Sequence, residues 1–109
     1  AGLGTTLNLT FAPGTPEGEY LDRFENEAAA AVRAFAPEFL IISAGFDAHK
    51  GDPLGELRLS SESFGHMTRI LKSVAHDCCD GRIVSILEGG YNLDALRSSV
   101  VVHLTALGE

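Results

Sequence analysis

The sequence predicts an α/β protein in which a parallel sheet is flanked by helices. Two short runs, FLIIS at residues 39–43 and IVSIL at residues 83–87, are continuously apolar, as expected of strands covered on both faces. Apolar residues at helical spacing precede the first run, separate the two runs and follow the second. Strands that alternate with helices favour right-handed crossovers and a parallel sheet. The 109 residues, 45% of them hydrophobic, suit one globular domain or part of one.

The N-terminal third of the chain predicts an extended segment followed by a helix. Residues 7–11 alternate apolar and polar side chains, which is typical of a half-buried extended segment, and residues 12–18 indicate a turn. Helical spacing then predicts a helix from Glu17 to Ala36, which Pro37 ends. The apolar positions of this helix are Tyr20, Phe24, Ala28, Ala31 and Phe35.

Two further helices are predicted, one before and one after the second strand. The first is capped by Ser60 and runs to about Asp77, and the second is capped by Asn92. Their apolar stripes are Phe64, Met67, Leu71 and Val74 in the first, and Leu93, Leu96, Val100, Leu104 and Leu107 in the second. A sheet of two or three strands leaves unpaired edges. We therefore expect missing neighbours, either from a longer parent chain or from self-association through the exposed sheet edges.

Charge and hydropathy exclude several classes of partner. Fifteen Asp and Glu against eight Lys and Arg give a net charge of −7, so we expect no nucleic acid partner. No apolar run approaches the roughly 18 residues that span a bilayer, so we expect no membrane partner. The acidic residues near the first helix are predicted to form a solvated face; they are Glu17, Glu19, Asp22, Glu25 and Glu27. The adjacent Cys78 and Cys79 fit reduced thiols and an intracellular location, cytoplasmic or, in a eukaryote, nuclear.

Two glycine-rich segments follow the predicted strands and are the candidates for a site. They are SAGFDAHKGDPLG at residues 43–55 and LEGGYN at residues 87–92. In parallel α/β sheets ligands bind beyond the carboxyl ends of the strands, so we expect both segments at the same edge. Asp47 is suited to holding a metal there, although an Asp in such a loop is more often a turn former or a helix cap. His49 and Asp52 are interpreted as polar loop residues.

The second segment places a phenol beside a sharp bend. Gly89 and Gly90 allow the backbone to turn, and Tyr91 then leaves the strand end toward the same edge. A phenol in this position is able to donate a hydrogen bond to a developing oxyanion, and a packing role is the alternative. Glu88 is interpreted as structural. An anion held at Gly89 and Gly90 near the N-terminus of the last helix is a further alternative.

Together these segments resemble the histone deacetylase family of zinc amidohydrolases, specifically its second class and the bacterial acetylpolyamine and acetoin-utilisation relatives. The resemblance covers essentially the whole chain, through APGTPEGEYLDRFE, FLIISAGFDAHKGDPLG, LRLSSESFGHMTRIL and RIVSILEGGYNLDAL. It implies an arginase/deacetylase-like α/β fold, of which residues 1–109 are the C-terminal portion of the catalytic domain. It also implies hydrolysis of acetylated lysine in protein or of a small acylated amine.

The resemblance assigns roles only at matching positions. Asp47 resembles the third protein ligand of the catalytic zinc. Tyr91 resembles the tyrosine that polarises the substrate carbonyl and stabilises the tetrahedral intermediate. Leu54 matches a residue at the rim of the acyl-lysine channel, and Gly89 and Gly90 match backbone at its inner end, so these three are implied to bind substrate. The implied reaction is zinc-assisted amide hydrolysis in which a histidine takes the proton of the attacking water.

Parts of the family's site have no counterpart in residues 1–109. An adjacent histidine pair and an Asp-x-His segment are missing, so the implied zinc site is incomplete and the isolated chain is expected to be inactive. His66, His76 and His103 lie on predicted helices and are expected in surface or packing roles, while His49 is at most a loop residue near the channel mouth. The alternative function is a non-catalytic interaction module that retains the deacetylase scaffold and binds a partner through its exposed sheet edge.

Overall fold

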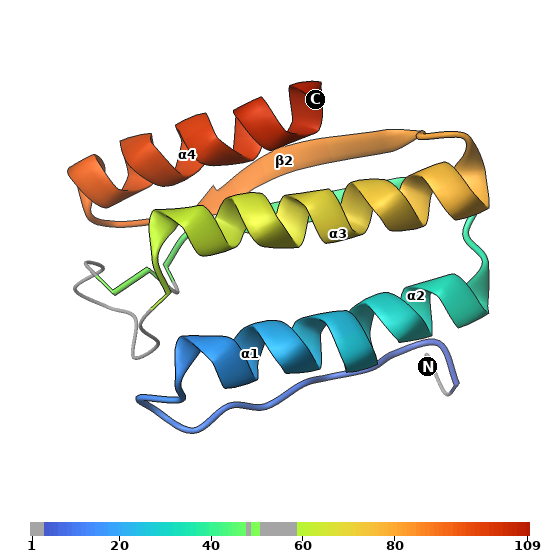
Figure 1. Ribbon diagram of the computed structural model, residues 1–109, viewed down its shortest axis with the longest axis horizontal. Helices are drawn as coiled ribbons and strands as arrows, with labels where there is room; N and C mark the ends of the chain where they lie inside the picture. The colour runs from blue at the N-terminus through green and yellow to red at the C-terminus, as the bar shows by residue number, and fades with distance from the viewer. Residues whose placement is uncertain (1–3, 48, 51–58) are drawn as a thin grey trace.

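The computed structural model describes residues 4–47, 49–50 and 59–109. The elements follow in the order α1 (Glu17–Arg23), η1 (Phe24–Ala29), α2 (Ala30–Phe35), β1 (Leu40–Gly45), α3 (Ser61–Cys79), β2 (Ile83–Gly89) and α4 (Leu93–Gly108) (Figure 1). Strands β1 and β2 pair in parallel, from Leu40 opposite Ile83 to Ala44 opposite Leu87. The predicted α/β class with a parallel sheet and flanking helices is confirmed.

The predicted first helix is present as one continuous helical segment. It runs through α1, the π-helical turn η1 and α2 without a break. It ends where Ala36 adopts a left-handed conformation with φ of 56°, directly before Pro37. A proline cannot continue a helix, which accounts for the boundary. The predicted end of this helix is therefore confirmed to within one residue.

The N-terminal segment before α1 lies outside the sheet. Residues 7–11 form no strand in the described part of the chain, and they run alongside α1 and α2 (Figure 1). Arg23 holds this segment, because its Nη1 donates to Thr10 O at 2.8 Å and its guanidinium lies 4.6 Å from the centre of the Phe11 ring. The backbone is extended, as predicted, but a side chain of α1 rather than a neighbouring strand holds it.

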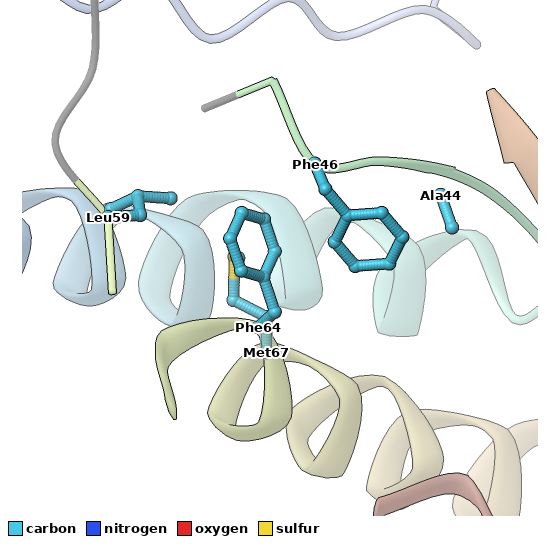
Figure 2. Close-up of a cluster of buried hydrophobic side chains, with 5 residues drawn as sticks. All are labelled: Ala44, Phe46, Leu59, Phe64 and Met67. Atoms are coloured by element: carbon cyan, nitrogen blue, oxygen red, sulfur yellow. The ribbon is translucent and has the colours of Figure 1, made fainter. Parts of the chain in front are cut away.

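The core lies where the end of β1 meets α3. Ala44 and Phe46 pack with Leu59, Phe64 and Met67, and all five are buried (Figure 2). The rings of Phe46 and Phe64 meet edge to face with centroids 5.0 Å apart. Partly buried side chains of α1, η1 and α4 pack against this cluster; they are Tyr20, Leu21, Phe24, Leu96 and Val100. The stripe predicted for α3 is confirmed, with Leu71 half-buried and the other three buried.

The stripe predicted for α4 is confirmed in part, because Leu96, Val100 and Leu107 are half-buried and the first two pack against the core. Leu93 is 80% exposed and Leu104 is also exposed, whereas the buried positions are Ala95, Ser99, His103 and Ala106. Small and polar residues face α3 because the two helices approach closely at Gly65. A Cβ added to Gly65 would lie 2.4 Å from Val102 Cγ1.

Helix α3 is held at its start by a residue of α1. Ser60 occupies the predicted cap position, but its side chain donates to Glu17 Oε1 at 2.6 Å instead of capping the helix. The backbone N–H of Ser60 donates to the same oxygen at 2.8 Å, and Ser63 Oγ donates to it as well. The predicted solvated face therefore holds for Glu19, Asp22, Glu25 and Glu27, which are exposed, but not for Glu17, which is half-buried and accepts hydrogen bonds at the start of α3. A carboxylate at a helix N-terminus is stabilising.

One face of the sheet is exposed in the part of the chain that the structure describes. In a parallel pair the residues opposite one another share a face, and Ile41, Val84 and Ile86 are 62%, 44% and 52% exposed. The opposite face is partly covered through Ile42 and Ala44. The expectation that both faces are covered is therefore not met by the residues that the structure describes. None of the helices in those residues is long and apolar enough to cross a membrane.

Candidate functional site

The two glycine-rich segments meet at one edge of the sheet. After a shift in register, Gly45 at the end of β1 lies opposite Gly89 at the end of β2. The next residue, Phe46, donates its backbone N–H to Gly89 O at 2.8 Å. SAGFD and LEGGYN therefore lie side by side at the carboxyl ends of β1 and β2, and the prediction of a shared edge is confirmed.

Asp47 lies in a turn directly past this pairing. The turn is closed by the backbone N–H of His49, which donates to Phe46 O at 3.2 Å. Phe46 and His49 are buried, whereas Asp47 is exposed. The chain thus anchors the residues on both sides of Asp47 and leaves its carboxylate accessible.

Two glycines border the carboxylate of Asp47. A Cβ added to Gly45 would lie 3.3 Å from Asp47 Oδ1, and one added to Gly89 would lie 3.7 Å from Asp47 Cγ. Because Gly45 and Gly89 have no side chains, the carboxylate of Asp47 has room beside the ends of the two strands. Tyr20 of α1 is close enough for its pKa to be raised by burial and by the negative charge of Asp47.

Tyr91 is brought to the same edge by a turn at Gly90. Gly90 has φ of 137°, a conformation that side chains rarely allow, and an added Cβ would lie 2.8 Å from Leu96 Cδ1. The chain turns there, and Tyr91 follows with 56% of its surface exposed. Asn92 then starts α4 by accepting the Ala95 N–H at 2.9 Å, as predicted.

His49 has surroundings that the sequence did not predict. It was interpreted as a polar loop residue, yet it is 8% exposed and its Nε2 lies 3.1 Å from Ser61 Oγ. Its ring stacks on Phe64 with an interplanar angle of 9°. Both contacts are to the start of α3, more than ten residues away along the chain, so no local pattern revealed them.

The remaining titratable groups near the core have structural partners. The hydrogen bonds from Ser60 and Ser63 lower the pKa of Glu17 to about 2. His103 is buried in a packing role, with Nδ1 2.6 Å from Thr68 Oγ1 and Nε2 2.8 Å from Ser85 Oγ. Burial lowers its pKa. His66 and His76 are exposed, which agrees with their predicted roles.

Asp47 is the candidate metal ligand at this edge among the described residues. Within residues 4–47, 49–50 and 59–109, no group of three or more His, Cys, Asp or Glu side chains is arranged to hold a metal ion. An exposed carboxylate between two glycines suits one of the three protein ligands that an open zinc site uses. Leu54, expected at the channel rim, and Asp52 lie outside the described residues.

Known proteins match this chain over nearly its whole length. A sequence model of the family described as "Histone deacetylase domain" matches residues 1–107. The chain is 42% identical over 106 residues to Type-2 histone deacetylase 1 of Dictyostelium discoideum. It is 43% identical over 111 residues to a rice protein named Histone deacetylase 10, chloroplastic.

A solved structure with a similar fold is the acetylpolyamine aminohydrolase from Burkholderia pseudomallei. It superimposes with a TM-score of 0.85 at 27% identity and covers 98% of this chain. The chain spans 30% of that protein, 25% of the rice relative and 7% of the Dictyostelium relative. It therefore corresponds to a small part of each of these three proteins.

Proposed function

The chain belongs to the histone deacetylase domain family, and we propose from this that residues 1–109 are the C-terminal portion of a zinc-dependent deacetylase catalytic domain. In this proposal Asp47 is a zinc ligand and Tyr91 is the catalytic tyrosine. The supporting observation is that both residues follow strands that end side by side, with Gly45 opposite Gly89. Asp47 and Tyr91 are both exposed at that edge.

The residues of this chain have distinct tasks in the proposed site. Asp47 holds a negative charge in a fixed turn, beside glycines that leave its oxygens open. Tyr91 donates its phenolic O–H to the oxygen of the substrate carbonyl and stabilises the charge that develops there. Gly89 and Gly90 border the inner end of the acyl channel, and Leu54 lines its rim. A bound zinc ion supplies Lewis-acid polarisation of the carbonyl and of a water molecule.

The proposed substrate is an acetylated lysine in a protein or a small acylated amine. Support comes from the names of relatives, which include histone deacetylases and an acetylpolyamine aminohydrolase. A net charge of −7 suits substrates of neutral or positive charge. The proposed location is intracellular, cytoplasmic or nuclear in a eukaryote; the rice relative is named as chloroplastic.

The rest of the domain completes the site and covers the sheet. Three protein ligands are needed for an open zinc site, and this chain offers Asp47. The bare face with Ile41, Val84 and Ile86 suits the same covering partner. We therefore propose that the isolated chain has no deacetylase turnover.

A second candidate function is a non-catalytic module that binds a partner through the sheet. The exposed apolar face favours it, because such patches mark interaction surfaces. The two candidates differ in the reading frame upstream of Ala1. An adjacent His-His pair followed by Asp-x-His there supports the deacetylase, and a frame that lacks them supports the module.

The experiment measures acetate release from an acetyl-lysine peptide and from an acetylated polyamine in the presence of Zn²⁺. The 109-residue chain is expected to be inactive and the complete domain active. In the complete domain, Tyr91→Phe is expected to lower kcat by about 10²–10³-fold, as for loss of one oxyanion donor. Asp47→Asn is expected to abolish turnover, and Asp22→Asn, a change at an exposed acid of α1, to leave it unchanged. Turnover with tightly bound zinc in the isolated chain contradicts the proposal.

A further inference from the structure

The turn that carries Asp47 is fastened at both ends. Phe46, before Asp47, is 3% exposed and belongs to the buried cluster between β1 and α3 (Figure 2). His49, after it, is 8% exposed and closes the turn by donating its N–H to Phe46 O. The backbone of Asp47 is therefore held between two buried aromatic side chains.

His49 is fixed by contacts to the start of α3. Its ring lies parallel to Phe64, with centroids 6.4 Å apart, and its Nε2 lies 3.1 Å from Ser61 Oγ. Its backbone also forms a bridge with Leu59, and Lys50 N donates to Leu59 O at 2.9 Å. These contacts tie the Asp47 turn to α3.

The same serine connects the turn to the helix that follows Tyr91. Ser61 Oγ lies 2.7 Å from Ser98 Oγ and accepts from Ser99 Oγ at 3.4 Å, and both partners are on α4. Helix α4 begins two residues after Tyr91. A continuous set of hydrogen bonds thus runs from His49 through Ser61 to the helix behind the tyrosine.

We propose that His49 is a positioning residue of the site, which fixes the Asp47 carboxylate and, through Ser61, sets it relative to the segment that carries Tyr91. This inference rests on the proposed function, in which Asp47 is a metal ligand. His49 itself is not a ligand here, because its ring is buried and its Nε2 is engaged by Ser61.

A positioning role has a measurable cost because catalytic groups tolerate little displacement. Ligands are oriented by the residues that support them, and loss of such support typically lowers metal affinity about 10–100-fold. Asp47 needs this support more than a residue within a strand does, since it lies past the last sheet pairing. The bond to Ser61 and the stacking on Phe64 are separable, because a phenylalanine keeps the second and loses the first.

The experiment compares four variants of the complete domain by Zn²⁺ affinity, measured in competition with a chelator, and by thermal unfolding. His49→Phe is expected to lower Zn²⁺ affinity about 10-fold or more. His49→Gln keeps a hydrogen-bonding group for Ser61 and is expected to restore most of the affinity. Ser61→Ala is expected to act in the same direction as His49→Phe. His66→Gln, at an exposed histidine of α3, is the control and is expected to change neither quantity.

A second measurement needs no metal. Hydrogen exchange of the amides in residues 45–47 and 89–92 is expected to be faster in His49→Phe and near normal in His49→Gln. The positioning role is overturned if exchange rates and affinity are unchanged in His49→Phe. It is also overturned if amide protection and affinity fall in both His49 variants in proportion to their unfolding temperatures. Asp47→Asn tests the proposed function separately: if that variant binds Zn²⁺ normally, the metal assignment fails, and the exchange result still decides the role of His49.

Discussion

The carboxylate of Asp47 lies against the backbone of Gly89, at the place where the two strands end. A Cβ added at Gly89 would be 3.7 Å from Asp47 Cγ, an ordinary contact, whereas one added at Gly45 would be 3.3 Å from Asp47 Oδ1. The second distance is tighter than most real contacts, so the carboxylate has to move. The two glycines therefore differ in how strongly they constrain Asp47.

Gly45→Ala is predicted to weaken the site more than Gly89→Ala does. In the complete domain, the shifted carboxylate is expected to lower Zn²⁺ affinity several-fold, since misplaced metal ligands bind less tightly. Chelator competition measures this. Gly18→Ala is the control, because Gly18 lies in α1 with nothing within 4 Å of an added Cβ. Equal affinity of the Gly45 and Gly89 variants contradicts the prediction.

Gly65→Ala is predicted to destabilise the packing of α3 on α4. The added Cβ would lie 2.4 Å from Val102 Cγ1, so the Val102 side chain or the helices have to shift. Overpacking of this kind typically costs about 1–3 kcal/mol. Urea unfolding measures the free energy of unfolding. A Gly65→Ala protein as stable as the Gly18→Ala control shows that the two helices do not approach this closely.

The sequence predicted the strands and the shared edge because both depend on local patterns and on the geometry of parallel sheets. The apolar runs marked β1 and β2, and their carboxyl ends must meet at one edge. The fully buried positions Ala95, Ser99 and Ala106 of α4 were missed because the close approach of Val102 to Gly65 of α3 orients this helix. That contact lies far away along the chain.

The errors at Glu17 and His49 have the same origin. Glu17 binds Ser60, 43 residues away, and His49 is buried by Phe64 and Ser61 of α3. From local sequence, Glu17 is expected to be solvated because it lies among other acids at a helix start. His49 is expected in a loop because glycines flank it. Their partners are brought near by the fold, so a single sequence read locally does not reveal them.

Glu17→Gln is predicted to destabilise the protein near neutral pH. The serine hydrogen bonds lower the pKa of Glu17 from 4.5 to about 2, so its contribution is complete above about 4.5 and is lost as the pH falls toward 2. Loss of this cap is expected to cost roughly 0.5–1 kcal/mol after allowance for solvent screening. Urea unfolding at several pH values measures it. A difference from the unmodified chain that is as large at pH about 2 as at neutral pH contradicts the assignment.

His103 is predicted to make stability depend on pH in a higher range. Burial lowers its pKa from 6.5, so the unfolded chain takes up the proton more readily. The free energy of unfolding is therefore expected to fall as the pH decreases below about 6.5. His103→Gln is expected to be less stable at neutral pH and to lack this dependence. His76→Gln, exposed on α3, is expected to retain it, and an unchanged slope in His103→Gln rules the explanation out.

The bare sheet face is predicted to make the isolated chain associate. Ile41, Val84 and Ile86 are exposed together, and apolar surface of this kind is buried whenever a partner is available. Replacing all three by Thr keeps the preference for strand structure and removes apolar surface. In the 109-residue chain we expect less self-association by sedimentation and less binding of a hydrophobic dye. Val101→Thr, exposed on α4, is expected to change neither.

In the complete domain the same three changes are expected to cost roughly 0.5–3 kcal/mol of folding stability each, because a covering segment buries these side chains there. If they cost nothing, the face is solvent-exposed in the complete domain too, and the interaction module becomes the better explanation.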